Sequence, residues 1–271
     1  GYDGQVFLDD DRTMYVVTDN GFFKIMKLAF DSQGKISIDN TDPRFTQTDS
    51  NEFIGEYHYK SVEGIRNMFE ASFLYKHNGL YYLMWSFEGS ENYNVRYAVS
   101  ENITGPYRGL NGSMDIPILK RDDYNQILGT GHHSMIDYNG KTYIVYHRQH
   151  YPFIDSKRQT CIEEITFAPD GSILPVIPSH KGVEIVKGAK RHTERNLALG
   201  KPTKVSASRH YASEYFKPRY RTTDIDFKFT GNYAVDDNYG TRWDPGVGAK
   251  NPWIIIDLEK DYKVNEIETI F

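Results

Sequence analysis

The sequence lacks features that mark several large protein classes. Its 271 residues include a single cysteine, Cys161, so no disulfide can form within the chain, and a lone thiol in a strand-like run is most often buried and inert. No apolar stretch approaches the ~18 residues that a membrane-spanning helix requires. No segment shows a sustained helical period. We therefore expect neither a disulfide-stabilised scaffold nor a membrane span, and β-structure becomes the expectation.

Clusters of positive charge are also missing. Lys and Arg number 32 against 37 Asp and Glu, the net charge is −5, and the basic residues are dispersed. A nucleic-acid surface needs a basic patch that neutralises phosphates. The charge pattern therefore argues against nucleic acid as a partner.

Aromatic residues, in contrast, are abundant. They make up 14% of the sequence and include 21 tyrosines. Tyrosine combines a flat apolar face with a hydroxyl group, which suits both the packing of β-sheets and surfaces that contact sugars. A β-rich core explains most of this excess, and a carbohydrate-binding surface is the functional alternative.

Short strand-like runs separated by polar turns recur along the chain. The predicted hairpins pair residues 5–8 with 14–18, 23–30 with 36–38, 73–75 with 80–85, and 134–138 with 142–146. Tyr15, Tyr82 and Tyr143 hold equivalent places in successive units, and a repeat of about 60 residues favours propeller blades over a sandwich. About three blades are visible, whereas about 4 to 8 close a propeller. We therefore expect the chain to be part of a longer protein and to lack the first blade or blades.

Glu70 is the first candidate for catalysis. It precedes the predicted strand 73–75 and has Phe69, Ala71 and Phe73 around it. Loss of hydration beside apolar side chains favours the protonated carboxyl group that a general acid needs at neutral pH. A solvated glutamate ahead of a strand is the structural alternative.

Asp3 and His132 hold comparable places at the entrances of two other predicted blades. Blades around one axis would bring both residues to a shared pocket with Glu70, and glycoside hydrolysis uses convergent carboxyl groups of this kind. For each residue, a satisfied turn position is the structural alternative.

Other residues are weaker candidates for the same pocket. Arg148 could bond a sugar hydroxyl or a carboxylate, or form a surface ion pair. Trp85, Phe87 and Tyr93 are candidates to line the pocket, and Trp85 fits core packing as well. The acidic run 9–11 lacks the further ligands of a calcium loop and is interpreted as a solvated turn.

An ordered set of motifs resembles glycoside hydrolase family 43. The motifs lie at residues 2–11, 69–76, 79–83, 129–134 and 164–171, and the resemblance covers residues 1–186. It implies a five-bladed β-propeller and an inverting mechanism that uses three acidic residues.

The resemblance also implies roles for individual residues. Glu70 matches the general acid, Asp3 matches the aspartate that orients and tunes it, and His132 matches a central histidine. No cofactor is required, although in some members the histidine helps to hold a water-bound calcium. The general base belongs to the first blade, so this chain alone is expected to be inactive. Gly4 departs from the family, which usually has proline after the aspartate.

The last part of the chain resembles a different family. Residues 187–194 are polar and basic, as expected for a linker, and residues 195–271 resemble the first half of a discoidin-type jelly-roll related to family 32 carbohydrate-binding modules. The motifs that carry this resemblance lie at 196–202, 234–237, 240–243 and 253–258. The resemblance implies a partial β-sandwich with sugar-binding loops.

The expected protein is therefore all-β, with an incomplete propeller over residues 1–186, a linker over 187–194 and a partial jelly-roll over 195–271. The family 43 resemblance implies a secreted or periplasmic glycosidase that acts on plant-type polysaccharide or oligosaccharide. The α-L-arabinofuranosidase or β-xylosidase type is favoured. Two alternatives stay open, a non-catalytic carbohydrate-binding propeller and a β-galactosidase of the same family.

Overall fold

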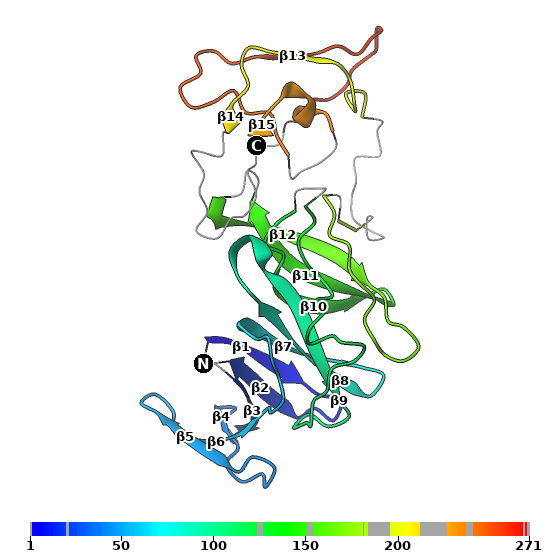
Figure 1. Ribbon diagram of the computed structural model, residues 1–271. Coiled ribbons are helices and arrows are strands. Elements are labelled where there is room, and N and C mark those ends of the chain that lie inside the picture. The colour runs from blue at the N-terminus through cyan, green and yellow to red at the C-terminus, as the bar shows by residue number, and fades with distance from the viewer. Residues whose placement is uncertain are drawn as a thin grey trace. The chain divides into compact units, whose positions relative to one another are not determined.

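The computed structural model shows a protein built from β-strands (Figure 1). The structure describes residues 2–19, 22–123, 127–150, 154–180, 182–183, 196–211, 227–236, 241–267 and 269. Helical elements within these ranges are the short 3-10 turns η1 (Ser90–Asn92) and η3 (Gly231–Ala234). None of the described helices is long and apolar enough to cross a membrane. The expectation of an all-β chain is confirmed.

The chain divides into two compact units. The first consists of Gly1–Arg148 and Thr160–Pro178, and the second of Gln149–Gln159 and Ser179–Phe271. The predicted linker, 187–194, lies outside the described residues. The boundaries proposed from the sequence at residues 186 and 195 therefore stay a prediction.

Three larger sheets follow one another along the chain (Figure 1). The first has the order β1-β2-β3-β6-β5 with β4 beside β3, the second β7-β8-β9, and the third β10-β11-β12. The strands of the first sheet are β1 (Tyr2–Leu8), β2 (Met14–Asp19), β3 (Phe23–Phe30), β4 (Ile36–Ile38), β5 (Gln47–Asn51) and β6 (Gly55–Ser61). Those of the other two are β7 (Glu70–His77), β8 (Leu80–Phe87), β9 (Asn94–Ser100), β10 (Gly131–Tyr138), β11 (Lys141–His150) and β12 (Ile154–Ile165).

The predicted hairpins are confirmed. They correspond to the antiparallel pairs β1–β2, β3–β4, β7–β8 and β10–β11. The hairpin β5–β6 was not predicted. Its first strand, Gln47–Asn51, is entirely polar and almost wholly exposed, so no apolar alternation marks it in the sequence.

Aromatic side chains fill the core of the first unit. One cluster contains Tyr15, Phe23 and Trp85, and a second contains Tyr82 and Tyr97. Tyr82 still satisfies its hydroxyl group by donating to the carbonyl oxygen of Gly171 at 2.6 Å. Core packing therefore accounts for much of the tyrosine content, as the β-rich interpretation predicts.

One prediction about the acidic turn 9–11 is wrong. Asp10 and Asp11 are exposed, but Asp9 is buried. Lys76 Nζ and Tyr81 Oη each lie 2.5 Å from its carboxylate. Burial acts to raise the pKa of Asp9, but these hydrogen bonds more than offset it and hold the pKa below its usual value. Asp9 thus links the β1–β2 turn to the second sheet, and the interpretation as a solvated turn is wrong for this residue.

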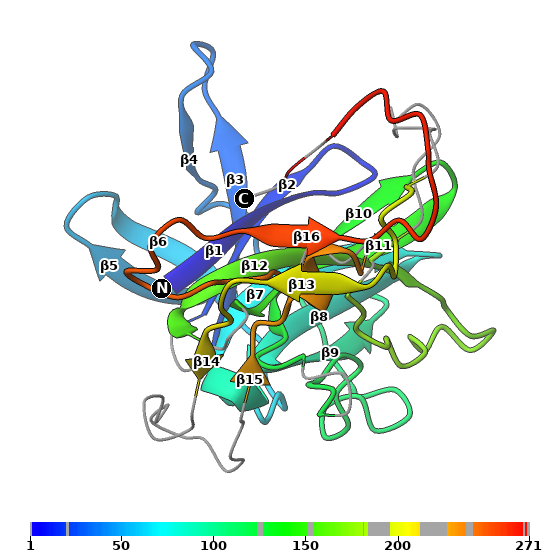
Figure 2. The same ribbon diagram turned by 90° about the horizontal axis from the view of Figure 1, so that it is seen from above.

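The second unit contains shorter strands. They are β13 (Thr203–Val205), β14 (His210–Tyr211), β15 (Phe227–Lys228) and β16 (Ile254–Ile256). β13 pairs with β16 in antiparallel fashion (Figure 2), and β14 pairs with β15. The strand predicted at 252–258 is confirmed at its centre by β16. The jelly-roll itself stays a prediction.

Candidate active site

Strands β1, β7 and β10 begin with the same irregularity, a β-bulge. The register against the neighbouring strand shifts between Tyr2 and Gln5, between Glu70 and Phe73, and between Gly131 and Ser134. The second residue of each bulge is left-handed, with φ of 52° at Asp3, 63° at Ala71 and 49° at His132. Bulges re-aim side chains, and positive φ is uncommon for residues other than glycine. The three strands thus share a bulge with a left-handed second residue, at the end where the predicted site residues lie.

The bulges bring Asp3, Glu70 and His132 together. Nε2 of His132 lies 3.8 Å from Oδ1 of Asp3, and its Nδ1 lies 3.8 Å from Oε1 of Glu70. All three side chains are partly exposed. The imidazole therefore stands between two carboxyl groups at a solvent-accessible point of the first unit. The sequence predicts this convergence, and the chemical roles of the three residues stay predictions.

Backbone amides of the second bulge point to carboxylates of the first sheet. The N–H of Ala71 donates to Oδ2 of Asp3 at 3.3 Å, and the N–H of Ser72 donates to Oδ2 of Asp19 at 3.0 Å. The Ser72 hydroxyl donates to the Asp3 carbonyl oxygen at 3.1 Å. A bulge disrupts the strand ladder locally, so these amides need partners elsewhere. The two aspartates therefore fix the backbone that carries Glu70.

Asp19 is a site residue that the sequence does not reveal. It is only 2% exposed. Burial raises the pKa of its carboxyl group, and the nearby charges of Asp3 and Glu70 raise it further. In the sequence it stands just before Asn20 and Gly21 and resembles an ordinary turn residue. Only its pairing with Ser72 in the folded chain makes it part of the site.

Tyr93 contacts Glu70 directly. Its hydroxyl donates to Oε1 of Glu70 at 2.5 Å and lies 3.4 Å from Nδ1 of His132. The ring is buried and stacks on His147, with centroids 5.4 Å apart and an interplanar angle of 8°. Burial raises the pKa of Tyr93 well above its ordinary value, and the Glu70 carboxylate raises it further. Tyr93 therefore stays protonated and acts as a hydrogen-bond donor.

Gly131 provides the space for the Tyr93 ring. A Cβ atom at this position would lie 2.2 Å from Cδ1 of Tyr93. Beside it, the N–H of His132 donates to Oγ of Ser86 at 2.9 Å, and Nδ1 of His147 lies 3.1 Å from the Gly129 carbonyl oxygen. The third bulge and the second sheet thus hold Tyr93 and His132 as one packed group.

His133 follows His132 but faces the interior. Its ring centroid lies 5.8 Å from that of Phe73, and neither ring nitrogen finds a hydrogen-bond partner within the part of the chain that the structure describes. Burial, with a smaller contribution from the charge of His132, lowers the pKa of His133 to about 3. The residue is therefore neutral at physiological pH and belongs to the interior rather than to the site.

Three more residues that the sequence predicts for the pocket are Trp85, Phe87 and Arg148. Trp85 is 0% exposed, packs on Phe23 and donates its indole N–H to the Asn67 carbonyl oxygen at 2.7 Å, so it supports the site from within the core. Phe87 is half-buried beneath the guanidinium group of Arg96, 4.7 Å from the ring centroid. Arg148 is 3% exposed, which rules out a surface ion pair. Contacts of Trp85, Phe87 and Arg148 with substrate stay predictions.

The described residues around His132 do not form a set of calcium ligands. Within the described residues, no three His, Cys, Asp or Glu side chains are grouped so that they could hold a metal ion. The carboxyl groups of Asp3 and Glu70 each lie 3.8 Å from one imidazole nitrogen of His132. We assign no chemical step to calcium.

Comparison with known families decides the classification. A sequence model described as "Glycosyl hydrolases family 43" matches residues 1–173, more than half of the chain. The chain belongs to glycosyl hydrolase family 43. The matched segment contains all three bulges, including Asp3, Glu70 and His132.

Two named relatives are similar to parts of this family 43 chain. It is 36% identical over 119 residues to the protein named "Beta-D-galactofuranosidase xynD" of Aspergillus niger, covering 42% of this chain and 34% of that protein. It is 37% identical over 82 residues to the protein named "Beta-xylosidase" of Xylanibacter ruminicola, covering 29% of this chain and 21% of that protein. The chain thus spans 34% or less of the length of these relatives.

Solved structures share the fold. A protein named "Glycoside hydrolase" is 23% identical with a TM-score of 0.69, covering 95% of this chain and 53% of that chain. A family 43 arabinoxylan arabinofuranohydrolase from Bacillus subtilis, solved in complex with cellotetraose, is 20% identical with a TM-score of 0.50, covering 75% of this chain and 40% of that chain. At these identities the likeness establishes a common fold for the family 43 chain.

Proposed function

We propose that the protein is an inverting glycosidase that releases α-L-arabinofuranosyl or β-D-xylosyl units from plant-type polysaccharide or oligosaccharide. The observation that carries this proposal is the meeting of Glu70, Asp3 and His132 at three matching bulges, with Tyr93 bonded to Glu70. Family membership supports the reaction class. Relatives named for xylosidase and arabinosidase activity support the choice of sugars.

Glu70 is proposed as the general acid. Its proton passes to the glycosidic oxygen as the bond from that oxygen to the anomeric carbon breaks, which leaves Glu70 as a carboxylate. A water molecule attacks the anomeric carbon from the opposite face and loses its proton to a general base, which inverting enzymes hold about 6.5–9.5 Å from the acid. We assign the base to no residue of this chain. Asp3, which accepts the N–H next to Glu70, orients the acid.

A test uses the full-length protein with nitrophenyl α-L-arabinofuranoside and β-D-xyloside. We expect Glu70→Gln to lower kcat by about 100-fold or more, because an amide cannot supply the proton. Glu52→Gln, an exposed glutamate in the β5–β6 turn, is the matched control and keeps full activity. NMR of the first product formed on a xylo-oligosaccharide should show inverted anomeric configuration. Full activity in Glu70→Gln, or retention of configuration, contradicts the proposal.

A second candidate sugar follows from one relative. The protein of Aspergillus niger is named for galactofuranoside hydrolysis, so nitrophenyl β-D-galactofuranoside belongs in the substrate panel. β-D-Galactopyranoside tests the β-galactosidase alternative. A protein that cleaves none of these substrates but is retained on arabinan or xylan would instead be a carbohydrate-binding propeller.

Further proposals concern the whole protein. We infer a propeller of five blades, a discoidin-like carbohydrate-binding domain over 195–271, and a secreted or periplasmic location. The β13–β16 pair within the last segment is compatible with a sandwich. Retention of a 195–271 deletion variant on immobilised arabinan or xylan, compared with the parent protein, tests the binding role, since undiminished retention contradicts it.

A further inference from the structure

The imidazole of His147, on β11, lies beside both rings that approach Glu70. Its centroid is 5.4 Å from that of Tyr93 with an interplanar angle of 8°, and 6.0 Å from that of His132 with an angle of 26°. Tyr93 Oη and His132 Nδ1 lie 2.5 Å and 3.8 Å from Oε1 of Glu70. One ring of the third sheet therefore stacks with both of the rings next to the proposed acid.

The position of the His147 ring is fixed by its strand and by one hydrogen bond. His147 pairs with Gly131 in the β10–β11 ladder. Its Nδ1 lies 3.1 Å from the Gly129 carbonyl oxygen, and because a carbonyl oxygen only accepts, Nδ1 carries the hydrogen. The N–H of Gly129 donates in turn to the carbonyl oxygen of Glu91 at 3.0 Å, two residues before Tyr93. The imidazole is therefore anchored to the backbone that leads to the ring on which it stacks.

The plane of the Tyr93 ring sets the direction of its hydroxyl hydrogen. A phenolic O–H lies in the plane of its ring, because the oxygen lone pair conjugates with the ring. Rotation about the Cβ–Cγ axis leaves Oη in place, since Oη lies on that axis, but it swings the hydrogen out of line with Oε1 of Glu70. A hydrogen bond weakens steeply as its donor angle falls. The χ2 torsion of tyrosine has only a broad preference of its own, so the stacked neighbour holds the plane.

We propose that His147 is a positioning residue for the proposed acid. By stacking on Tyr93, its imidazole holds the ring plane in which the tyrosine O–H points at Oε1 of Glu70. The inference rests on the proposed function, because the direction of this hydroxyl matters for catalysis only if Glu70 is the acid. The effect of His147 passes through Tyr93, and this dependence can be measured.

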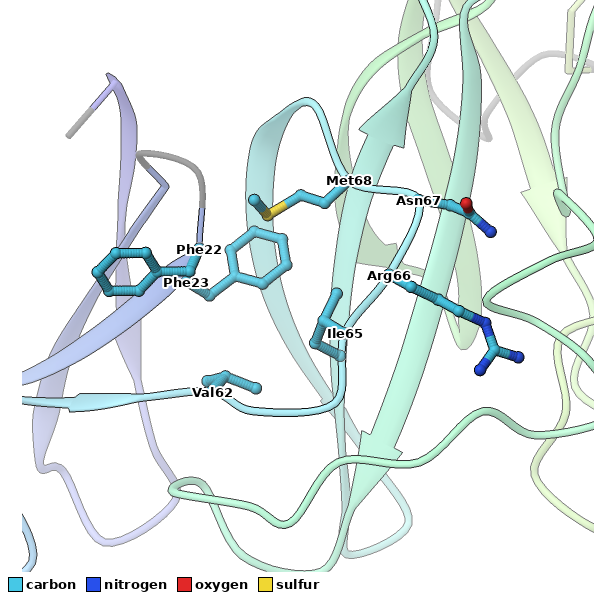
Figure 3. Close-up of a pocket in the computed structure, with 7 residues that line it drawn as sticks. All are labelled: Phe22, Phe23, Val62, Ile65, Arg66, Asn67 and Met68. Atoms are coloured by element: carbon cyan, nitrogen blue, oxygen red, sulfur yellow. The ribbon is translucent and has the colours of Figure 1, made fainter.

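The backbone that leads to Glu70 has a separate support against the first sheet (Figure 3). A pocket of about 220 Å³ is lined there by Phe22, Phe23, Val62, Ile65, Arg66, Asn67 and Met68. The side chains of Phe23, Ile65 and Met68 are turned toward one another, whereas that of Arg66 points away. Ile65 and Met68 pack on the buried cluster that contains Phe23. Because this packing does not involve Tyr93, a change at His147 should leave the backbone of Glu70 in place.

The test compares two substitutions of His147 in the full-length protein. His147→Phe keeps a flat ring but loses the hydrogen bond to Gly129, whereas His147→Gln keeps an N–H donor but loses the ring. On xylotriose or arabinotriose, whichever the parent cleaves, we expect kcat to fall about fivefold in His147→Gln and less than about twofold in His147→Phe. The dinitrophenyl glycoside of the same sugar needs little protonation of its leaving group, so kcat on it should stay within about twofold in both variants.

His77→Gln is the matched control. His77 also stacks on an aromatic ring, that of Phe167, with centroids 3.9 Å apart and an interplanar angle of 10°. It ends strand β7, which begins with Glu70, and the rise per residue of a strand places it about 20 Å from the acid. The same loss of a stacked imidazole at this distance should leave kcat unchanged on both substrates.

A double variant tests whether His147 acts through Tyr93. Tyr93→Phe removes the hydroxyl group, so the addition of His147→Gln should lower kcat no further. Coupled residues give non-additive effects, whereas the losses of independent residues multiply. Multiplied losses overturn the proposal, and so does an unchanged kcat in Tyr93→Phe, because His147 would then have nothing to act through.

The two single variants can overturn the proposal as well. Parent-like kcat in His147→Gln, equal losses in His147→Gln and His147→Phe, or a loss confined to His147→Phe would show that the ring plane does not matter. Equal losses on the oligosaccharide and the dinitrophenyl glycoside would show that proton donation is not affected.

Thermal unfolding midpoints identify a variant that does not fold. His147→Leu, which also lacks a flat ring, then replaces His147→Gln, and His147→Tyr replaces His147→Phe. A parent protein that cleaves neither substrate, or full activity in Glu70→Gln, contradicts the proposed function itself, which is a separate result.

Discussion

Tyr93 Oη lies 2.5 Å from Glu70 Oε1 and donates a hydrogen bond to it. With Oε1 engaged as an acceptor, Oε2 is the oxygen that would carry the proton in the proposed role of Glu70 as general acid. The tyrosine is buried against His147 and stays protonated. Tyr93 is thus a positioning residue for the proposed acid.

Tyr93→Phe should therefore impair proton donation more than binding. We expect kcat to fall about tenfold for substrates with poor leaving groups, such as oligosaccharides, because a hydrogen bond to an ionisable group is lost. Dinitrophenyl glycosides, which need little protonation, should lose less than about threefold. Tyr82→Phe removes the hydroxyl of another buried tyrosine, on β8, which donates to the Gly171 carbonyl oxygen, and serves as control. Equal losses of kcat on both kinds of leaving group would contradict the positioning role of Tyr93.

Gly131 should be intolerant of a side chain. In Gly131→Ala the new Cβ would overlap the Tyr93 ring at 2.2 Å, so the ring must move away from Glu70 or the bulge must shift. We expect a loss of about 1–3 kcal/mol in the free energy of unfolding and the leaving-group dependence of Tyr93→Phe. Gly89→Ala meets no atom within 4 Å and is the matched control. Parent-like activity and stability in Gly131→Ala would contradict this packing.

The charge of Asp19 should lower the stability of the fold, while its carboxylate positions the backbone next to Glu70. Its pKa is raised in the fold, so the unfolded chain ionises more readily and stability falls as pH rises from about 4 through the folded pKa. Asp19→Asn keeps an oxygen that can accept the Ser72 N–H but removes the charge. Thermal unfolding at pH 7 should show a raised midpoint, while kcat falls by about tenfold as the field around Glu70 changes. A lowered midpoint at pH 7 would refute the electrostatic argument.

His133 should make stability depend on pH. Its pKa is about 3 in the fold and about 6.5 in the unfolded chain. The unfolded chain therefore binds the extra proton, so the contribution to stability is fully present above pH 6.5 and is lost as pH falls toward 3. Between pH 7.5 and 5 the loss should be about 2 kcal/mol.

Urea unfolding at pH 7.5 and pH 5 measures that loss. His133→Leu removes the titrating ring and should shrink the difference between the two pH values by about 2 kcal/mol. His58→Leu on β6 alters a histidine with no such burial and should keep the difference of the parent protein. An unchanged pH difference in His133→Leu would show that another group is responsible.

The sequence predicts the parts of this site that depend on local pattern. Glu70, Asp3 and His132 could be found because each stands at the entrance of an alternating strand run, and repeated entrances converge. Asp19 was missed because its partner, the Ser72 N–H, is 53 residues away and is released only by a bulge. Tyr93 was expected only to line the pocket, since its contact with Glu70 depends on the packing of two sheets.

Fold features, too, can be predicted from the sequence only where they leave a local pattern. Hairpins with one buried face are visible as apolar alternation, whereas β5 has no buried face and left no signal. Asp9 looked solvated because its neighbours are acidic, and its burial comes from Lys76 and Tyr81 of the second sheet. Long-range pairing thus decides what local pattern leaves open.

The bond between Trp85 and Asn67 gives the protein an internal fluorescent probe. The chain has three tryptophans, and of these Trp85 is wholly buried while Trp253 is 49% exposed. A buried indole emits at shorter wavelength than a hydrated one, so the blue edge of the emission spectrum reports on Trp85. Because its N–H donates to the Asn67 carbonyl oxygen, in the segment that leads into β7 and Glu70, a movement of this segment shifts the emission wavelength of the protein.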